Sequence, residues 1–234
     1  MSSSGLAREQ LVATSRIVEQ FTEAILSPDE EAPGAYVREL LRQGVSPATL
    51  IKEVFTPAAH VLGERWKTDE CSFYDVTLAS GHIQRLLRAV SPLFLADSAP
   101  LGSTGRMLLT CASGEQHSLG SLVIAEYFIR DGWDVHLLTP YNPDILFDMV
   151  RKTEYHCVGF SVACTQHVPG LRKDIHRVRQ VSRNNDIRVL GGGQLLNSEP
   201  SLAEDLGVDA VATDAESAVL MARRLRGIAE LTLG

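Results

Sequence analysis

The sequence predicts an α/β protein in which a small helical bundle precedes a doubly wound parallel sheet of five strands. Before residue 91, apolar residues recur at helical spacing, and after residue 105 short apolar segments alternate with helical ones. Between the two halves, residues 91–105 contain the Ser-Pro, Ala-Pro and Gly-Ser-Thr-Gly sequences that are typical of linkers. We therefore expect a helical domain over residues 1–96 and a sheet domain over residues 106–234.

Turn and capping residues divide the first half into helices. Ser27-Pro28 interrupts the first apolar pattern, and Gly44 follows the second. Ser46-Pro47 combines an N-cap residue with a proline in the first helical position, so a third helix begins there. The predicted helices span residues 6–26, 34–43, 47–65 and 73–90. Short connections between them indicate an antiparallel bundle.

The second half alternates between strand-like and helix-like segments, which is typical of a parallel sheet with crossover helices. The predicted strands span residues 106–111, 133–138, 156–162, 187–191 and 209–212. The predicted helices span residues 119–131, 143–153, 168–183, 199–206 and 214–228. In such sheets, ligands bind beyond the carboxyl ends of the strands, where the strand order reverses.

Charge and composition exclude several classes of protein. The formal net charge is −7, with 9 basic and 12 acidic residues in residues 1–96 and 13 and 17 in the remainder. Autonomous DNA binding is not expected, because phosphate contacts need clustered Lys and Arg. No apolar run approaches the length of a membrane span and the start lacks the apolar core of a secretion signal, so we expect a cytoplasmic protein. The four cysteines have no CxxC spacing, and we expect them to be free and buried.

One loop carries candidate metal chemistry. Gly114-Glu-Gln-His-Ser-Leu-Gly120 follows the first predicted strand, at the ligand edge of the sheet. Glu115 can hold one ring nitrogen of His117, which leaves the other nitrogen to bind a metal. Gly120 would let the following helix approach closely. Taken alone, Glu115 could equally be a helix cap and His117 an ordinary loop residue.

Two further elements lie at the same edge. Ser161 ends the third predicted strand, 44 residues after His117, and the run from Gly191 through Gly192 to Gly193 follows the fourth. Glycines allow close backbone approach by a bulky ligand, although a tight strand–helix turn explains them too. His167 lies just past the third strand, near this edge.

Residues 106–228 resemble a cobalamin-binding (vitamin B12) domain, whose flavodoxin-like fold carries D/ExHxxG, SxL/V/T and GG elements in this order. The resemblance implies that His117 is the lower axial ligand of cobalt, with Glu115 and Ser161 orienting it. Gly192 and Gly193 would line the channel for the nucleotide tail. Haem is a minor alternative, because a histidine-ligated iron is chemically possible.

The helical half resembles the bundle that covers the upper corrin face in such proteins. The resemblance implies that Trp66, in Leu62-Gly-Glu-Arg-Trp66, caps the cofactor, while core packing is the alternative for this ring. His82 is a candidate upper ligand, and packing within the helix is its alternative. Adenosylcobalamin light sensors have Glu-His where this chain has Val76-Thr77. We therefore expect hydroxo- or aquocobalamin to be favoured, with the methyl and adenosyl forms as further options.

Two branches of the family remain. Residues 66–88 and Gly114-Glu-Gln-His-Ser-Leu-Gly120 resemble AerR/PpaA-type regulators of photosynthesis genes. That resemblance implies a non-enzymatic, light-responsive antirepressor and photoreceptor that acts through a partner DNA-binding transcription repressor. The alternative is a corrinoid methyl-carrier protein serving a separate methyltransferase, although such carriers usually read Gly-Asp-x-His-Asp-Ile-Gly in this loop.

Overall fold

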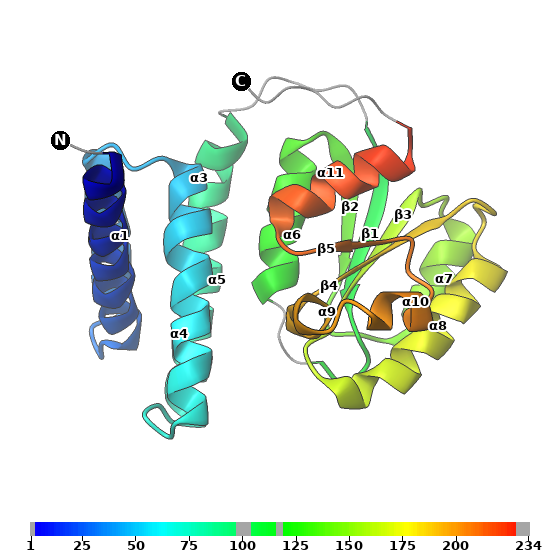
Figure 1. The fold of residues 1–234 in the computed structure, drawn as a ribbon, viewed down its shortest axis with the longest axis horizontal. Helices are drawn as coiled ribbons and strands as arrows, with labels where there is room; N and C mark the ends of the chain where they lie inside the picture. The colour runs from blue at the N-terminus through cyan, green and yellow to red at the C-terminus, as the bar shows by residue number, and fades with distance from the viewer. Residues whose placement is uncertain (1–2, 97–103, 116–118, 228–234) are drawn as a thin grey trace. The chain divides into compact units, whose positions relative to one another are not determined.

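A computed structural model describes residues 3–96, 104–115 and 119–227 of the chain, with side chains from residue 14 onward. The chain divides into two compact units, Met1–Asp97 and Ser98–Gly234. The first unit is helical, and the second is a parallel sheet with helices on both faces, as Figure 1 shows. This architecture confirms the predicted fold class.

The helical unit is built around buried apolar side chains. Its elements are α1 (Ser3–Leu26), α2 (Ala32–Arg42), α3 (Pro47–Thr49), the π-helical turn η1 (Leu50–Phe55), α4 (Thr56–Lys67) and α5 (Phe73–Ala96). Phe21 of α1 lies at the centre, stacked on Phe55 at 5.2 Å and on Tyr36 at 6.3 Å between ring centroids. Burying such rings supplies much of the driving force for a small bundle.

The predicted helix over 47–65 is present, but it contains a wide turn. Ser46 caps it as expected, and its side chain accepts a hydrogen bond from the backbone N–H of Thr49 at 3.1 Å. Leu50–Phe55 then forms a π-helical turn, whose end is marked by the bond from the N–H of Thr56 to the carbonyl of Ile51. Apolar spacing alone does not reveal such a turn, because it inserts one residue into the helical repeat.

The sheet unit has five parallel strands in the order β2-β1-β3-β4-β5. The strands are β1 (Gly105–Cys111), β2 (Trp133–Leu138), β3 (Cys157–Ser161), β4 (Arg188–Gly192) and β5 (Ala210–Ala212). After β1 the chain moves outward to β2, and it then returns to the other side of β1 to form β3. The strand order therefore reverses between β1 and β3, which is where a ligand crevice is expected.

Helices cover both faces of the sheet (Figure 1). One face packs against α6 (Leu119–Arg130) and α11 (Ala215–Leu225), and the other packs against α7 (Pro143–Lys152) and α8 (Val168–Val181). The short elements are η2 (Thr165–His167), α9 (Gln194–Ser198) and α10 (Leu202–Leu206). The helix predicted over 199–206 was wrong in extent, because Pro200 separates two short helices there. No helix in the described ranges is both long and apolar enough to cross a membrane.

Candidate functional site

The candidate site lies at the carboxyl ends of β1 and β3, where the strand order reverses. Glu115, on the loop after β1, sends its side chain inward, and that side chain is only 2 % exposed. Its Oε2 accepts a hydrogen bond from the backbone N–H of Ala163, after β3, at 3.0 Å. A buried carboxylate needs such donors to offset its desolvation. Glu115 therefore joins the two loops that flank the switch point.

Two further side chains lie beside this carboxylate. His167 Nδ1 is 3.6 Å from Glu115 Oε2, and the His167 side chain is 12 % exposed. Cys164 is half-buried and free of any disulfide, whereas Cys71, Cys111 and Cys157 are buried. The expectation that all four cysteines are buried was thus wrong for Cys164, which comes after the end of β3 and not within the strand.

The two glycines at the end of β4 pack closely against neighbouring backbone, and at Gly193 this packing requires glycine. Gly193 has φ +100°, and an added Cβ would lie 2.4 Å from the carbonyl oxygen of Val162 and 3.0 Å from Ser161 Oγ. An added Cβ at Gly192 would lie 3.2 Å from the carbonyl oxygen of Ala212. Only glycine fits a positive φ at such a close approach. Gly193 therefore lets the chain after β4 pack against the end of β3, and Gly192 lies close to the end of β5. Contact of these glycines with a nucleotide tail stays a prediction.

The other residues predicted at this edge lie in the following places. Ser161 is the last residue of β3 and pairs in register with Cys111 and Gly192. Gly120 is the second residue of α6, and an added Cβ there would meet no heavy atom of the described residues within 4 Å. Helix packing therefore does not explain Gly120. His117 lies outside the described residues, so its role as a metal ligand stays a prediction.

Several large apolar side chains are exposed on the helical unit near the connection of α4 and α5. Trp66 is 46 % exposed near the end of α4, so the core-packing alternative for this ring is wrong. Phe73 and Tyr74 open α5 with 69 % and 68 % exposure, and Leu78 follows with 45 %. The exposed Trp66 ring is available for stacking, and its role as a cofactor cap stays a prediction.

His82 lies inside the helical unit, at 6 % exposure, on the buried face of α5. Burial lowers its pKa, Arg85 lowers it further, and Glu30 and a hydrogen bond with the backbone of Ile25 act in the opposite direction. Its Nδ1 is buried and has no hydrogen-bond partner among the described residues. The packing alternative accounts for this placement. A role for His82 as upper ligand stays a prediction that requires the ring to leave the core.

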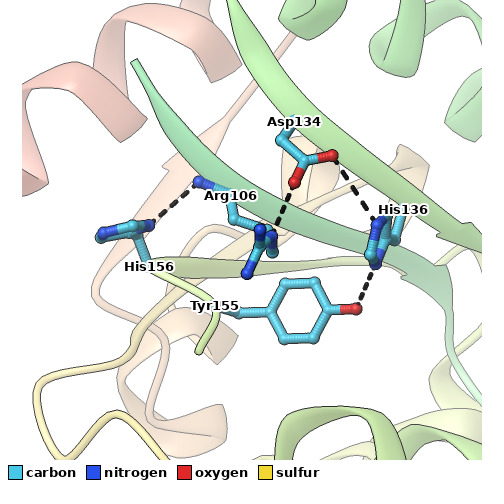
Figure 2. A network of polar contacts seen from close by, with 5 residues as sticks. All are labelled: Arg106, Asp134, His136, Tyr155 and His156. Carbon is cyan, nitrogen blue, oxygen red and sulfur yellow. Dashed lines mark hydrogen bonds and ion pairs between the residues drawn. The ribbon is translucent and has the colours of Figure 1, made fainter. Parts of the chain in front are cut away.

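A second polar cluster, drawn in Figure 2, lies near the starts of β1, β2 and β3, at the amino end of the sheet. Arg106 Nε donates to Asp134 Oδ2 at 2.6 Å, and the backbone N–H of Arg106 donates to His156 Nδ1 at 3.0 Å. His136 lies 3.7 Å from Asp134 on one side and hydrogen-bonds Tyr155 on the other. These contacts link the starts of β1, β2 and β3, so this network aligns strands at the edge away from the candidate site.

Two residues of the candidate site, Cys164 and His167, were not predicted as metal ligands from the sequence. Cys164 and His167 follow β3 at a spacing of three, and this C-x-x-H pattern was a usable signal. The donor from Ala163 had no signal at all, because a backbone N–H is available at every residue except proline.

Comparison with protein families identifies both units. The family described as "B12 binding domain" matches residues 105–222, and a second family with the same description matches residues 17–91. Both descriptions indicate a cobalamin cofactor, and neither supports the haem alternative.

Individual relatives cover much of the chain. A 20.5 kDa uncharacterized protein in the bchF-crtJ intergenic region of Rhodobacter capsulatus is 27 % identical over 157 residues, which is 67 % of this chain and 81 % of that one. Monomethylamine corrinoid protein 1 of Methanosarcina acetivorans is 21 % identical over 218 residues, 90 % of this chain and 98 % of its own. The structure of the Methanosarcina barkeri monomethylamine corrinoid protein superposes with a TM-score of 0.77 at 15 % identity, covering 90 % of this chain and 99 % of that one.

Proposed function

Because the chain belongs to the family of B12 binding domains, we propose that it is a cobalamin-dependent, light-responsive regulator that acts through a separate DNA-binding repressor. The observation that carries the cobalamin part is the buried Glu115 carboxylate, fixed by Ala163 at the carboxyl end of β1, two residues before His117. A carboxylate in that place orients an imidazole and raises its basicity as a metal ligand.

The described residues fit the cofactor. Glu115, Ser161 and the glycines Gly192 and Gly193 all lie at one edge of the sheet, around the reversal of strand order. When bound, cobalamin supplies a cobalt centre whose upper ligand can be exchanged, and light can break the bond between cobalt and that ligand. We assign His117 as the lower ligand, Glu115 as the residue that orients it, and Trp66 as an aromatic cap.

The regulator proposal rests on the loop sequence and on charge. The loop from Gly114 to Gly120 resembles AerR/PpaA-type regulators more than methyl carriers. A net charge of −7 disfavours direct DNA contact, so a partner protein would bind the promoter. Val76 and Thr77, in place of the Glu-His pair of adenosyl-binding light sensors, favour the hydroxo form.

Hydroxocobalamin binding tests the cofactor assignment. The purified protein is incubated with hydroxocobalamin, desalted, and examined by absorption spectroscopy. We expect retention with a histidine-ligated spectrum, and loss of both in His117→Ala. His176→Ala, on the exposed surface of α8, is the matched control and should behave as wild type. Unchanged retention and spectrum in His117→Ala would exclude His117 as ligand.

Promoter binding and proteolysis test the regulatory part. We expect the protein alone not to shift promoter DNA at physiological salt, and sequence-specific binding by the protein alone would overturn the partner proposal. Limited proteolysis of the methylcobalamin form should differ between darkness and illumination. The same pattern in apo, dark and illuminated samples would overturn the light response.

A methyl-carrier function is the second candidate. It is favoured by the match to monomethylamine corrinoid proteins over 90 % of the chain. A carrier would pass a methyl group from its methylcobalamin form to a thiol acceptor when a methyltransferase is added, and light would not be needed. Methyl transfer of this kind, combined with light-independent proteolysis, would decide for the carrier.

A further inference from the structure

We infer that Glu115, Cys164 and His167 form a binding site for a divalent metal ion of the zinc class, separate from the cobalt of the cofactor. One carboxylate oxygen, one cysteine sulfur and one ring nitrogen from these residues lie within 4.8 Å of one another. Oxygen, nitrogen and sulfur are the three donor types that zinc accepts in proteins.

Local backbone structure brings Cys164 and His167 together. Cys164 precedes the 3₁₀ turn η2, and the backbone N–H of His167 donates to the carbonyl of Cys164 at 3.1 Å. Cys164 is the N-cap residue of this turn, with an extended backbone, and His167 is the last residue of the turn. The C-x-x-H spacing therefore places the two residues at the two ends of one turn, and their ligand atoms lie within 4.8 Å of each other.

The distance between His167 and Glu115 is more typical of two ligands of one metal ion than of a hydrogen bond. Their Nδ1 and Oε2 atoms are 3.6 Å apart, beyond the usual hydrogen-bond range. Two atoms bound to one tetrahedral zinc ion lie about 3.3–3.6 Å apart, given bonds of about 2.0–2.3 Å. His167 Nδ1 is also buried and has no hydrogen-bond partner in the described part of the chain. A bound cation would satisfy this nitrogen.

Burial and charge favour a cation here. The side chains of Glu115 and His167 are 2 % and 12 % exposed, so both are largely withdrawn from water. A carboxylate and a thiolate together balance the two charges of a divalent ion. The bond from Ala163 to Glu115 Oε2 can persist as an outer-shell contact that holds the carboxylate in place.

The other nitrogen of His167 also has a suitable partner. Nε2 lies 3.2 Å from the side-chain amide of Gln166, and the amide can be oriented with its oxygen toward the ring. Nε2–H then donates to that oxygen, which leaves the Nδ1 lone pair directed at the metal. Gly114 gives the ring its space, because an added Cβ there would lie 3.1 Å from Nε2.

The donor set selects among metals. A thiolate and an imidazole bind zinc and other borderline or soft ions well, whereas magnesium and calcium prefer oxygen donors alone. Three protein ligands leave a fourth position for water, as in open zinc sites.

Because both sites use Glu115, we expect metal binding and cofactor binding to compete with each other. This consequence rests on the proposed cobalamin function. A carboxylate bound to zinc is not available to orient His117. We therefore expect zinc-loaded protein to take up hydroxocobalamin more slowly and less completely than metal-free protein.

The test uses full-length, cofactor-free protein that has been reduced and treated with a chelator. Zinc itself has no visible spectrum, so Co²⁺ is the first probe, and a thiolate-to-cobalt charge-transfer band reports Cys164 binding directly. Zn²⁺ is then titrated against the cobalt signal to give its affinity. We expect one equivalent bound, with the band lost in Cys164→Ser.

Variants decide the assignment. We expect His167→Gln and Glu115→Gln each to weaken Zn²⁺ binding more than about 100-fold, because even outer-shell changes cost about 10–100-fold. The matched controls are Cys71→Ser, which is buried in the helical unit, and His176→Gln, which is exposed on α8. Both should keep the band and the affinity, and circular dichroism should show that every variant is folded.

Two results would overturn the inference. A wild-type protein without the charge-transfer band, or a Cys164→Ser variant that binds both ions as wild type does, would exclude this site. Equal hydroxocobalamin uptake with and without bound Zn²⁺ would overturn the shared use of Glu115. Failure of the proposed cofactor function is distinguishable, because metal-free protein would then retain no hydroxocobalamin while the metal titration is unaffected.

Discussion

The carboxylate of Glu115 accepts a hydrogen bond from the backbone N–H of Ala163 across the point where the strand order of the sheet reverses. The two residues are 48 positions apart in the sequence. Their contact fixes the loop that leads to His117 relative to the end of β3. The proposed function gives the same side chain a second role, in cofactor binding, and substitutions can separate the two roles.

Glu115→Ala should destabilise the protein, and Glu115→Gln should do so much less. Alanine leaves the N–H of Ala163 without its acceptor, which costs about 1–3 kcal/mol, whereas the glutamine oxygen can still accept that bond. Both variants should weaken hydroxocobalamin binding by about 10–100-fold, because neither has a carboxylate to orient His117. Urea unfolding and cofactor titration measure the two effects. Equal stability of the two variants would show that the Ala163 contact contributes little.

Gly193→Ala should lower the free energy of unfolding by about 1–3 kcal/mol from backbone strain alone, with a further loss from steric overlap. The cause is the φ of +100°, together with the 2.4 Å separation between an added Cβ and the carbonyl oxygen of Val162. Gly170→Ala is the matched control, because Gly170 lies in α8 with no described heavy atom within 4 Å of an added Cβ. We expect Gly170→Ala to stabilise by about 0.4–1 kcal/mol. A Gly193→Ala protein as stable as wild type in urea unfolding would contradict this account.

His82 should make the stability of the protein depend on pH. Burial lowers the pKa of His82 from its ordinary value of 6.5, so the unfolded chain binds a proton there more readily than the folded chain. This contribution is present above pH 6.5 and is lost as the pH falls toward the lower folded-state pKa. Arg85 adds to this effect, and Glu30 and the backbone of Ile25 reduce it.

The change that tests this pH dependence is His82→Leu, which removes the titrating group from the core. Between pH 7.5 and pH 5.5, wild type should lose more stability in urea than His82→Leu does. His60→Gln, on the exposed surface of α4, should follow wild type. Parallel pH profiles for wild type and His82→Leu would show that the ring does not titrate in this range.

Tyr155→Phe should cost about 0.5–1.5 kcal/mol of stability for each hydrogen bond that the hydroxyl group loses. The ring of Tyr155 is fully buried, and its hydroxyl group contacts His136 in the network at the amino end of the sheet (Figure 2). Phenylalanine keeps the packing and removes the hydroxyl group, and with it the contact with His136 and the hydrogen bond with the side chain of Thr153. Cofactor binding should not change, because this network lies at the edge away from Glu115. A variant that loses hydroxocobalamin would contradict that separation.

The sequence predicted the architecture well because periodicity reports burial directly. The apolar segments after residue 105 became five strands, and Ser46-Pro47 began a helix as its capping chemistry required. The wide turn at Leu50–Phe55 and the continuation of α5 through Pro92 were missed. Apolar spacing does not record a π-helical turn, and a proline within a helical pattern normally predicts the end of the helix.

The site was harder to predict because its motif recurs. A carboxylate two residues before a histidine occurs at Glu115–His117, Asp134–His136, Glu154–His156 and Asp174–His176. Only the first pair follows the carboxyl end of a strand. Position in the topology therefore distinguishes the candidate ligand from the others. Contacts such as that between Glu115 and His167 join loops far apart in sequence, so they emerge only from the folded chain.

The two outermost strands, β2 and β5, also affect the tendency of the protein to aggregate at high concentration. Unpaired strand edges are templates for intermolecular pairing and aggregation. β5 offers only three residues, Ala210–Ala212, and β2 carries Asp134 and His136 with side chains 49 % and 42 % exposed. A short edge on one side and a charged one on the other discourage the addition of a strand from a neighbouring molecule. The sheet can thus remain finite in a crowded cell.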